Sequence, residues 1–126
     1  MFASSAKKRV LLVDDEAYLR EIYSLELSRE GFDVLLATNG EEGLDMIRRE
    51  RPDAILLDLQ MPVKSGFDVL KGLGEDKKLR SIPVIILSNV DEEGSFKKAG
   101  EFETHFYLVK ALTTPTKVAK LLREVL

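Results

Sequence analysis

The stretch ILLDLQMP, residues 55–62, decides the fold, because it places one carboxylate at the end of an apolar run of strand length. Pro62 has no backbone N–H and is typical of a position at which a strand cannot continue. Asp58 is therefore expected where a buried strand meets an open loop. A carboxylate there is costly to desolvate unless it binds or reacts with something. For Asp58 taken alone, a helix cap or turn former is an equal alternative.

A second group of acids follows an equally apolar run. RVLLV, residues 9–13, is β-prone and precedes Asp14, Asp15 and Glu16, which predicts a strand buried on both faces. Elsewhere, apolar residues recur at helical spacing between such runs. The predicted strands are residues 9–13, 32–37, 53–58, 84–87 and 106–109. The predicted helices are residues 16–30, 40–50, a short one after Gly66, 91–103 (weakened by Gly94 and Gly100), and a last one capped by Thr114 and Pro115.

Alternation of five strands with five helices predicts an α/β fold with a parallel sheet covered on both faces, because right-handed crossovers leave few other topologies. The expected strand order is 2-1-3-4-5, the flavodoxin-like doubly wound arrangement, with ligands bound at the carboxyl ends of the strands. The polar residues at these ends should converge on one pocket: Asp14, Asp15, Asp58, Ser88 and Lys110.

Length and composition exclude several classes of protein. The 126 residues suit a short head (residues 1–7) and a single domain (residues 8–126), and the absence of cysteine excludes disulfides and thiolate chemistry. Residues 1–6 do not resemble a secretory signal, and no apolar run is long enough to cross a bilayer, so a cytoplasmic protein without membrane contact is expected. The net charge of −3, with dispersed Lys and Arg, argues against direct nucleic-acid binding.

The predicted pocket contains more negative charge than it can hold unaided. Carboxylates 4–5 Å apart repel by roughly 3–4 kcal/mol per pair at an effective dielectric of about 20, so the cluster needs a proton or a cation. Oxygen ligands without His or Cys favour a hard cation, best Mg²⁺. Lys110 adds a positive charge and Ser88 a hydroxyl donor, so the pocket could hold a phosphoryl group in line with Asp58 as nucleophile. The product would be an acyl phosphate on the protein itself.

These residues together resemble a response-regulator receiver domain, over about residues 8 to 126. The acidic pair in VDDE (residues 13–16) and the loop DLQMP (residues 58–62) with Gly66 are similar to the family's metal and phosphoacceptor segments. Ser88 stands at the place of the family's switch hydroxyl, Tyr107 at that of its switch aromatic and Lys110 at that of its lysine.

The resemblance implies a signalling phosphoacceptor rather than an enzyme, one that assists its own phosphorylation and dephosphorylation. Asp58 would take a phosphoryl group from a histidine kinase, a phosphotransfer protein or a small phosphodonor. Asp15, Asp58 and the backbone carbonyl of Gln60 would bind Mg²⁺ directly, and Asp14 mostly through water. An unknown downstream protein would recognise the surface formed by the fourth helix, fifth strand and last helix. Because the last helix reaches Leu126, a stand-alone module is expected, with a fragment of a longer regulator as the alternative.

Some positions depart from the family pattern. Ala111 follows Lys110 where a proline is usual, Asn89 replaces a small residue beside Ser88, and Glu103 stands where a glycine usually ends the fourth helix. The single histidine, His105, is assigned no function.

Three rival functions have to be weighed against a receiver. A phosphatase of the haloacid dehalogenase type needs an acid two residues after its nucleophile, where this chain has Gln60. A flavin- or nucleotide-binding domain needs a phosphate loop of glycines and hydroxyls after the first strand, where this chain has three acids. A receiver-like scaffold that is not phosphorylated stays open as an alternative.

Overall fold

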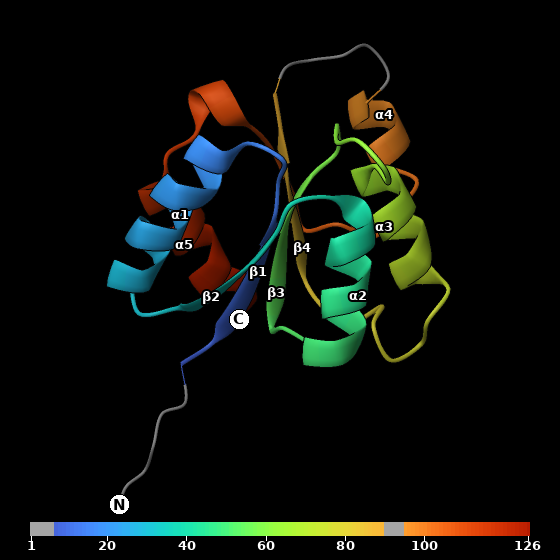
Figure 1. The fold of residues 1–126 in the computed structure, drawn as a ribbon, viewed down its shortest axis with the longest axis horizontal. Coiled ribbons are helices and arrows are strands. Elements are labelled where there is room, and N and C mark those ends of the chain that lie inside the picture. The colour runs from blue at the N-terminus through green and yellow to red at the C-terminus, as the bar shows by residue number, and fades with distance from the viewer. Residues whose placement is uncertain (1–6, 90–94) are drawn as a thin grey trace, which may run out of the picture.

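The computed structural model describes residues 7–89 and 95–126 and consists of three layers, helices on a sheet on helices. In Figure 1, α1 and α5 cover one face of the sheet, and α2, α3 and α4 cover the other. The strands are β1 (Arg9–Val13), β2 (Asp33–Ala37), β3 (Ala54–Asp58), β4 (Val84–Ser88) and β5 (Phe106–Val109). The helices are α1 (Ala17–Arg29), α2 (Gly40–Glu50), α3 (Gly66–Gly74), α4 (Ser95–Ala99) and α5 (Pro115–Val125), with a short 3₁₀ helix η1 (Lys110–Leu112) before α5.

The five strands are parallel and lie in the order β2-β1-β3-β4-β5, which confirms the predicted doubly wound fold. The strand order reverses beside β1, which pairs with both β2 and β3. Along the register, Val13 pairs with Leu57, and Asp58 pairs with Leu87. The strands therefore end together, and the loops after them gather at a single edge of the sheet, called here the carboxyl edge.

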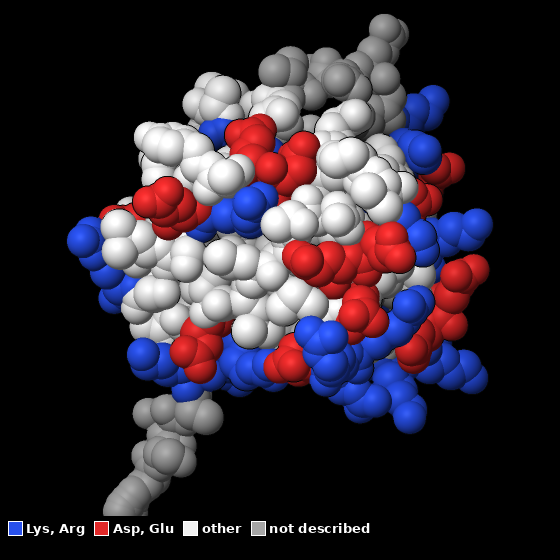
Figure 2. All heavy atoms as spheres, viewed as in Figure 1, with Lys and Arg blue, Asp and Glu red and all other residues white. Residues whose placement is uncertain are grey.

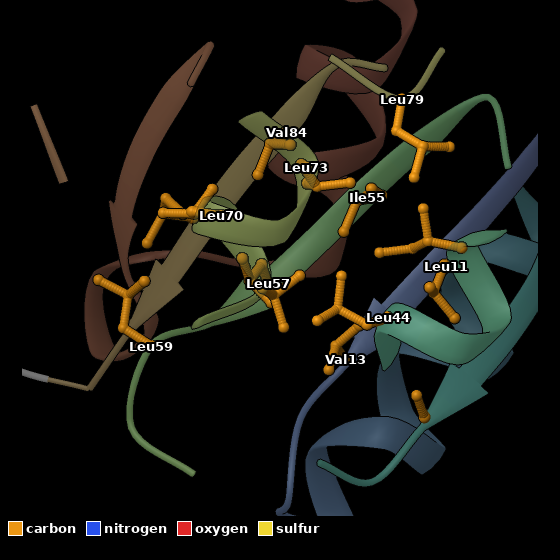
Figure 3. Close-up of a cluster of buried hydrophobic side chains, with 14 of the residues drawn as sticks. Leu11, Val13, Leu44, Ile55, Leu57, Leu59, Leu70, Leu73, Leu79 and Val84 are labelled. Carbon is orange, nitrogen blue, oxygen red and sulfur yellow. The ribbon is translucent and has the colours of Figure 1, made fainter. Parts of the chain in front are cut away.

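Each face of the sheet contributes to its own apolar core, because successive side chains along a strand point to opposite faces. Leu11 and Leu57 face α2 and α3, where they meet Leu44 and Leu70 (Figure 3). Val10, Leu12 and Leu56, which point the other way, belong to the second core, against α1 and α5. Burial on both faces explains why β1, β3 and β4 read as continuous apolar runs, whereas the edge strands β2 and β5 are only partly buried.

Local hydrogen bonds fix the start of three helices. Asn39 accepts a hydrogen bond from the backbone N–H of Glu42 at the start of α2, and Ser65 forms a reciprocal capping box with Asp68 at the start of α3. The Thr114 side chain caps α5, as the sequence predicts. Within the described residues, no helix is long and apolar enough to cross a membrane.

The prediction of a helix over residues 91–103 is wrong at its carboxyl end, and its residues 91–94 lie outside the described part of the chain. The structure ends α4 at Ala99, and Gly100 begins a turn in which the Phe102 N–H donates to the Ala99 carbonyl. Phe102 then packs against the core between α3 and β4 instead of continuing the helix. Glu103 lies beyond the helix altogether.

Candidate functional site

The carboxyl edge brings together all five residues that the sequence places at strand ends. Asp58 is the last residue of β3 and Ser88 the last of β4, while Asp14 follows β1 and Lys110 follows β5. Asp14 and Asp58 are 0% exposed and Ser88 is 1% exposed, whereas Asp15 is exposed. Figure 2 shows acidic side chains gathered at the end of the molecule where the strands end.

Lys110 is the positive centre of this site. Its Nζ lies 2.7 Å from Asp14 Oδ2, 3.4 Å from Glu16 Oε1 and 3.5 Å from Asp58 Oδ2. The Lys110 side chain is only 7% exposed, so the first and last of these ion pairs are shielded from water. The lysine therefore ties β5 to the ends of β1 and β3.

The two aspartates after β1 have different environments. Asp14 Oδ1 accepts a hydrogen bond from the backbone N–H of Glu16 at 2.9 Å, and Asp14 Oδ2 pairs with Lys110. The backbone carbonyl of Asp14 accepts a further hydrogen bond from the Arg20 guanidinium at 2.7 Å. Asp14 is thus held in place by the protein, while Asp15 is exposed and open to a ligand from solvent.

The donor set fits a hard divalent cation. Asp14, Asp15 and Asp58 each offer one carboxylate oxygen, and these oxygens all lie within 4.8 Å of one another. Asp58 Oδ1 accepts a hydrogen bond from the backbone N–H of Gln60 at 3.2 Å, whereas Asp58 Oδ2 has no hydrogen-bond partner among the described residues. A buried carboxylate oxygen in that state is a ready ligand for a cation.

Burial and surplus charge shift the ionisation of the site. Burial, reinforced by the negative charge of Asp14, raises the pKa of Asp58 to about 7. Burial also raises the pKa of Asp14, although Lys110 opposes the shift. For Lys110, burial lowers the pKa, but the hydrogen bond to Asp14 and the nearby carboxylates outweigh burial and raise it. The lysine is therefore charged at neutral pH. Asp58 is only partly ionised there, and an additional positive charge beside it would lower its pKa.

Ser88 and Tyr107 lie on the strands between the site and α4. Tyr107 pairs with Ile86 and Ser88 with Val109, so Ser88 and Tyr107 lie on the same face of neighbouring strands. The Tyr107 ring packs edge-on against Phe96 of α4, with centroids 5.2 Å apart. Its hydroxyl is buried and has no hydrogen-bond partner among the described residues. The ring borders an open hollow of about 590 Å³ between α4 and β5.

The contact between Glu16 and Asn89 could not be predicted from the sequence. Asn89 Nδ2 donates to Glu16 Oε1 at 3.3 Å, and the same oxygen faces Lys110. Glu16 is visible in the sequence as a third acid after β1, and Asn89 as a departure beside Ser88, but nothing in the sequence joins them. Ala111, another departure from the family pattern, lies exposed in η1. His105, to which no function is assigned, is exposed, and its backbone N–H donates to the Val84 carbonyl.

Fold and site together define a doubly wound α/β protein with an acidic, lysine-containing pocket at its strand-order switch. The family model for the response regulator receiver domain matches residues 10–123, and the chain belongs to this family. Receiver domains are phosphoacceptor modules of two-component signalling that interact with histidine kinases and downstream targets, which makes this chain a signalling phosphoacceptor.

Relatives of two lengths match the chain. It is 32% identical over 108 residues to the polar-differentiation response regulator DivK of Brucella anthropi, covering 86% of this chain and 88% of the relative. It is 34% identical over 120 residues to a probable transcriptional regulator ycf27 of Porphyridium aerugineum, covering 95% of this chain and 48% of the relative. The chain therefore spans about half the length of the ycf27 regulator and most of DivK.

Solved structures agree with the fold. The chemotaxis protein CheY4 of Vibrio cholerae superposes with a TM-score of 0.87 at 29% identity, over 96% of this chain and 100% of that one. The response regulator TrrA of Thermotoga maritima, solved in complex with Mg²⁺ and beryllium fluoride, gives a TM-score of 0.81 at 30% identity, over 94% of this chain and 99% of that one.

Proposed function

We propose that Asp58 is the phosphoacceptor of this receiver domain. The observation that carries the proposal is the state of Asp58 Oδ2, which is buried at the end of β3, lacks a hydrogen-bond partner among the described residues, and lies 3.5 Å from Lys110 Nζ. The carboxylate oxygen that lacks a hydrogen bond is thus the one that faces the Lys110 ammonium group. An electrophilic phosphorus atom delivered to that side would meet both a nucleophile and a counter-charge.

Mg²⁺ is the cation that we propose for the acidic cluster. Asp15, Asp58 and the backbone carbonyl of Gln60 would hold it directly, and Asp14, whose carboxylate pairs with Lys110, would act through water. Bound Mg²⁺ supplies positive charge that offsets the carboxylates and the incoming phosphoryl oxygens. The all-oxygen donor set of the cluster and the crowding of its charge support this assignment.

In the transfer step, Asp58 Oδ2 attacks the phosphorus of a phosphohistidine on a kinase or phosphotransfer protein, or of a small phosphodonor. The new P–O bond forms as the bond from phosphorus to the donor breaks, and the donor leaves with that bonding pair. Lys110 Nζ and the Ser88 hydroxyl then donate hydrogen bonds to phosphoryl oxygens. Because the same groups stabilise charge when water later hydrolyses the acyl phosphate, the domain assists both its phosphorylation and its dephosphorylation.

The signal would leave through the surface of α4, β5 and α5. Movement of the Ser88 hydroxyl toward the phosphoryl group vacates space beside β5, on the face of the sheet that also carries Tyr107. The Tyr107 ring, which contacts Phe96 of α4, can then move inward and shift α4. The phosphoryl group biases this equilibrium only through contacts present in one state. Residues 8–126 would form one cytoplasmic signalling domain, preceded by residues 1–7 as a head.

Incubation with acetyl phosphate and Mg²⁺ followed by intact-protein mass spectrometry tests the phosphoacceptor. The wild type should gain one phosphoryl group, while Asp58→Asn and a metal-free sample should gain none. Asp45→Asn is the matched control, because Asp45 is an exposed acid of α2 paired only with Arg49 among the described residues, and it should label like the wild type. Labelling of Asp58→Asn to the wild-type extent would show that another residue is the nucleophile.

Hydrogen exchange tests the switch. Addition of Mg²⁺ and beryllofluoride to the wild type should change amide exchange across residues 95–107, and Ser88→Ala should shrink that change while Asp58 is still labelled. Ser81→Ala, an exposed serine at the far end of the sheet, is the control. Equal exchange changes in wild type and Ser88→Ala would refute the switch and leave phosphorylation of Asp58 intact.

A further inference from the structure

Glu16 is a third carboxylate on Lys110 that the proposed chemistry does not use. We infer that Glu16 is an internal anion, held by Asn89, that occupies Lys110 until a phosphoryl group displaces it, and that it thereby slows phosphorylation of Asp58. This inference rests on the proposed function and adds a residue that sets its rate.

Three carboxylates crowd the Lys110 ammonium group, and Glu16 accepts a hydrogen bond from it. An ammonium group has three N–H donors. Three carboxylates surround Lys110 Nζ, those of Asp14 at 2.7 Å, Glu16 at 3.4 Å and Asp58 at 3.5 Å. A phosphoryl oxygen on Asp58 therefore competes with the Glu16 carboxylate for an N–H donor of the lysine.

Burial decides which carboxylate leaves. Asp14 is 0% exposed and makes the shortest of the three contacts, so its departure would leave an uncompensated charge in the interior. Asp58 is the acceptor and carries the phosphoryl group itself. The Glu16 side chain is 45% exposed and makes no capping hydrogen bond to α1 within the described residues, so it can turn into solvent at little cost.

Asn89 holds Glu16 over the site. Its Nδ2 donates to Glu16 Oε1 at 3.3 Å, the oxygen that also faces Lys110. The backbone N–H of Glu16 is bonded separately to Asp14 Oδ1, so a change of the Glu16 side chain leaves the turn after β1 in place. The Glu16 carboxylate is then a removable negative charge at the entrance to a site that receives anions.

Acetyl phosphate tests the inference without a partner protein, since the P–O bond to Asp58 forms as the P–O bond to acetate breaks and acetate leaves. Glu16→Gln keeps the size of the side chain and removes its charge. Its initial labelling rate with Mg²⁺ should rise about two- to fivefold, the range expected for loss of an exposed ion pair. Asn89→Ala should give a smaller rise, and the double variant should be no faster than Glu16→Gln alone.

Two controls separate this role from simpler ones. Glu21→Gln removes an exposed acid on the next turn of α1 and should label at the wild-type rate. The dissociation constant for Mg²⁺ should change less than twofold in Glu16→Gln, because the acid acts on Lys110 and not on the metal. If Glu16→Gln folds poorly, Glu16→Asp, whose shorter side chain keeps the charge but draws it back, should accelerate labelling in the same way.

The outcomes are distinct. A labelling rate in Glu16→Gln equal to or below that of the wild type would overturn the role of Glu16 and leave the proposed function standing. Weakened Mg²⁺ binding in Glu16→Gln would overturn it too, by making Glu16 a metal ligand. Independent, additive effects of the two substitutions would refute the holding role of Asn89. A wild type that takes up no phosphoryl group would overturn the proposed function together with this inference.

Discussion

Charged side chains lie at both ends of the parallel strands, but they are exposed at one end and buried at the other. The edge opposite the carboxyl edge, where the strands begin, is called here the amino edge. There the Arg9 guanidinium pairs with Glu50 at 2.6 Å, and the Arg9 backbone N–H donates to Asp53 Oδ2 at 2.7 Å. The paired side chains of Arg9 and Glu50 are about one third exposed. At the carboxyl edge, Asp14 and Asp58 are 0% exposed and share a single buried lysine, Lys110. Both edges use carboxylates and a basic side chain, yet only the amino edge balances them in contact with water.

The difference shows that burial and charge balance, more than residue type, separate a structural ion pair from a reactive site. The amino-edge charges cost little to desolvate and stabilise the fold modestly. The carboxyl edge keeps an excess of buried negative charge, and the pKa of Asp58, raised to about 7, reports how unfavourable its ionised form is there. A bound cation offsets this excess charge, so it lowers the cost of ionising Asp58.

Removing the basic side chain from each edge is the strongest test of this contrast. Lys110→Ala should lower the free energy of unfolding by about 3 kcal/mol in metal-free buffer near neutral pH, because it leaves buried carboxylates without a partner. Arg9→Ala should lower it by only about 1 kcal/mol, because water replaces the lost contacts. Urea unfolding measures both. Equal losses of unfolding free energy in the two variants would contradict the contrast between the edges. If the double variant Lys110→Ala with Asp58→Asn recovers part of the loss, the cost comes from the unpaired buried carboxylate.

Removing a carboxylate should give effects of opposite sign at the two edges. The pKa of Asp58 is about 7 in the folded protein and about 4 in the unfolded chain, so its contribution to stability falls as pH rises through this window. Asp58→Asn should therefore stabilise the protein by about 2 kcal/mol at neutral pH and by less at about pH 5. Asp53→Asn should destabilise it by about 1 kcal/mol. Denaturation at both pH values is the measurement, and a destabilised Asp58→Asn at neutral pH would contradict the argument.

A divalent cation should stabilise the carboxyl edge selectively. At ten times its dissociation constant, Mg²⁺ should raise the free energy of unfolding of the wild type by about 1.4 kcal/mol, because the unfolded chain lacks the assembled ligands. Asp15→Ala should remove most of this gain, while Asp45→Ala, at an exposed acid of α2, should retain it. Thermal melts with and without Mg²⁺ decide the point, and a full gain in Asp15→Ala would remove Asp15 from the ligand set.

The smallest expected difference concerns backbone strain. Val63, in the loop after Asp58, has φ 70°, and Arg51, which ends α2 at the amino edge, has φ 46°. The left-handed region is costlier for a β-branched residue, so Val63→Gly should stabilise by about 1 kcal/mol and Arg51→Gly by about half as much. The Val63 conformation is held where the Lys64 carbonyl accepts a hydrogen bond from Gly40 N–H at 3.0 Å. A destabilised Val63→Gly would show that the loop is unstrained.

Most of the fold could be predicted because burial leaves a direct mark on the sequence. Strands buried on both faces require continuous apolar runs, and in β1 and β3 the first charged residue of the run, Asp14 or Asp58, marks the end of the strand. Caps and terminal charges located α2 and α5 almost to the residue. The prediction failed at the carboxyl end of α4, because helical spacing continued through Gly100 while Phe102 found a tertiary contact that ended the helix.

The sequence by itself thus determined the three-layer fold and the set of polar residues at the carboxyl edge, since both follow from hydrophobic periodicity and the short connections between elements. Only the tertiary structure decided which of these residues touch. Asp14 and Asp15 are adjacent in the chain, yet one is buried against Lys110 and the other faces solvent. Glu16 and Asn89 lie 73 residues apart and meet because β1, β3 and β4 end at one level. Such contacts depend on strand order, register and side-chain rotamers, which no local pattern records.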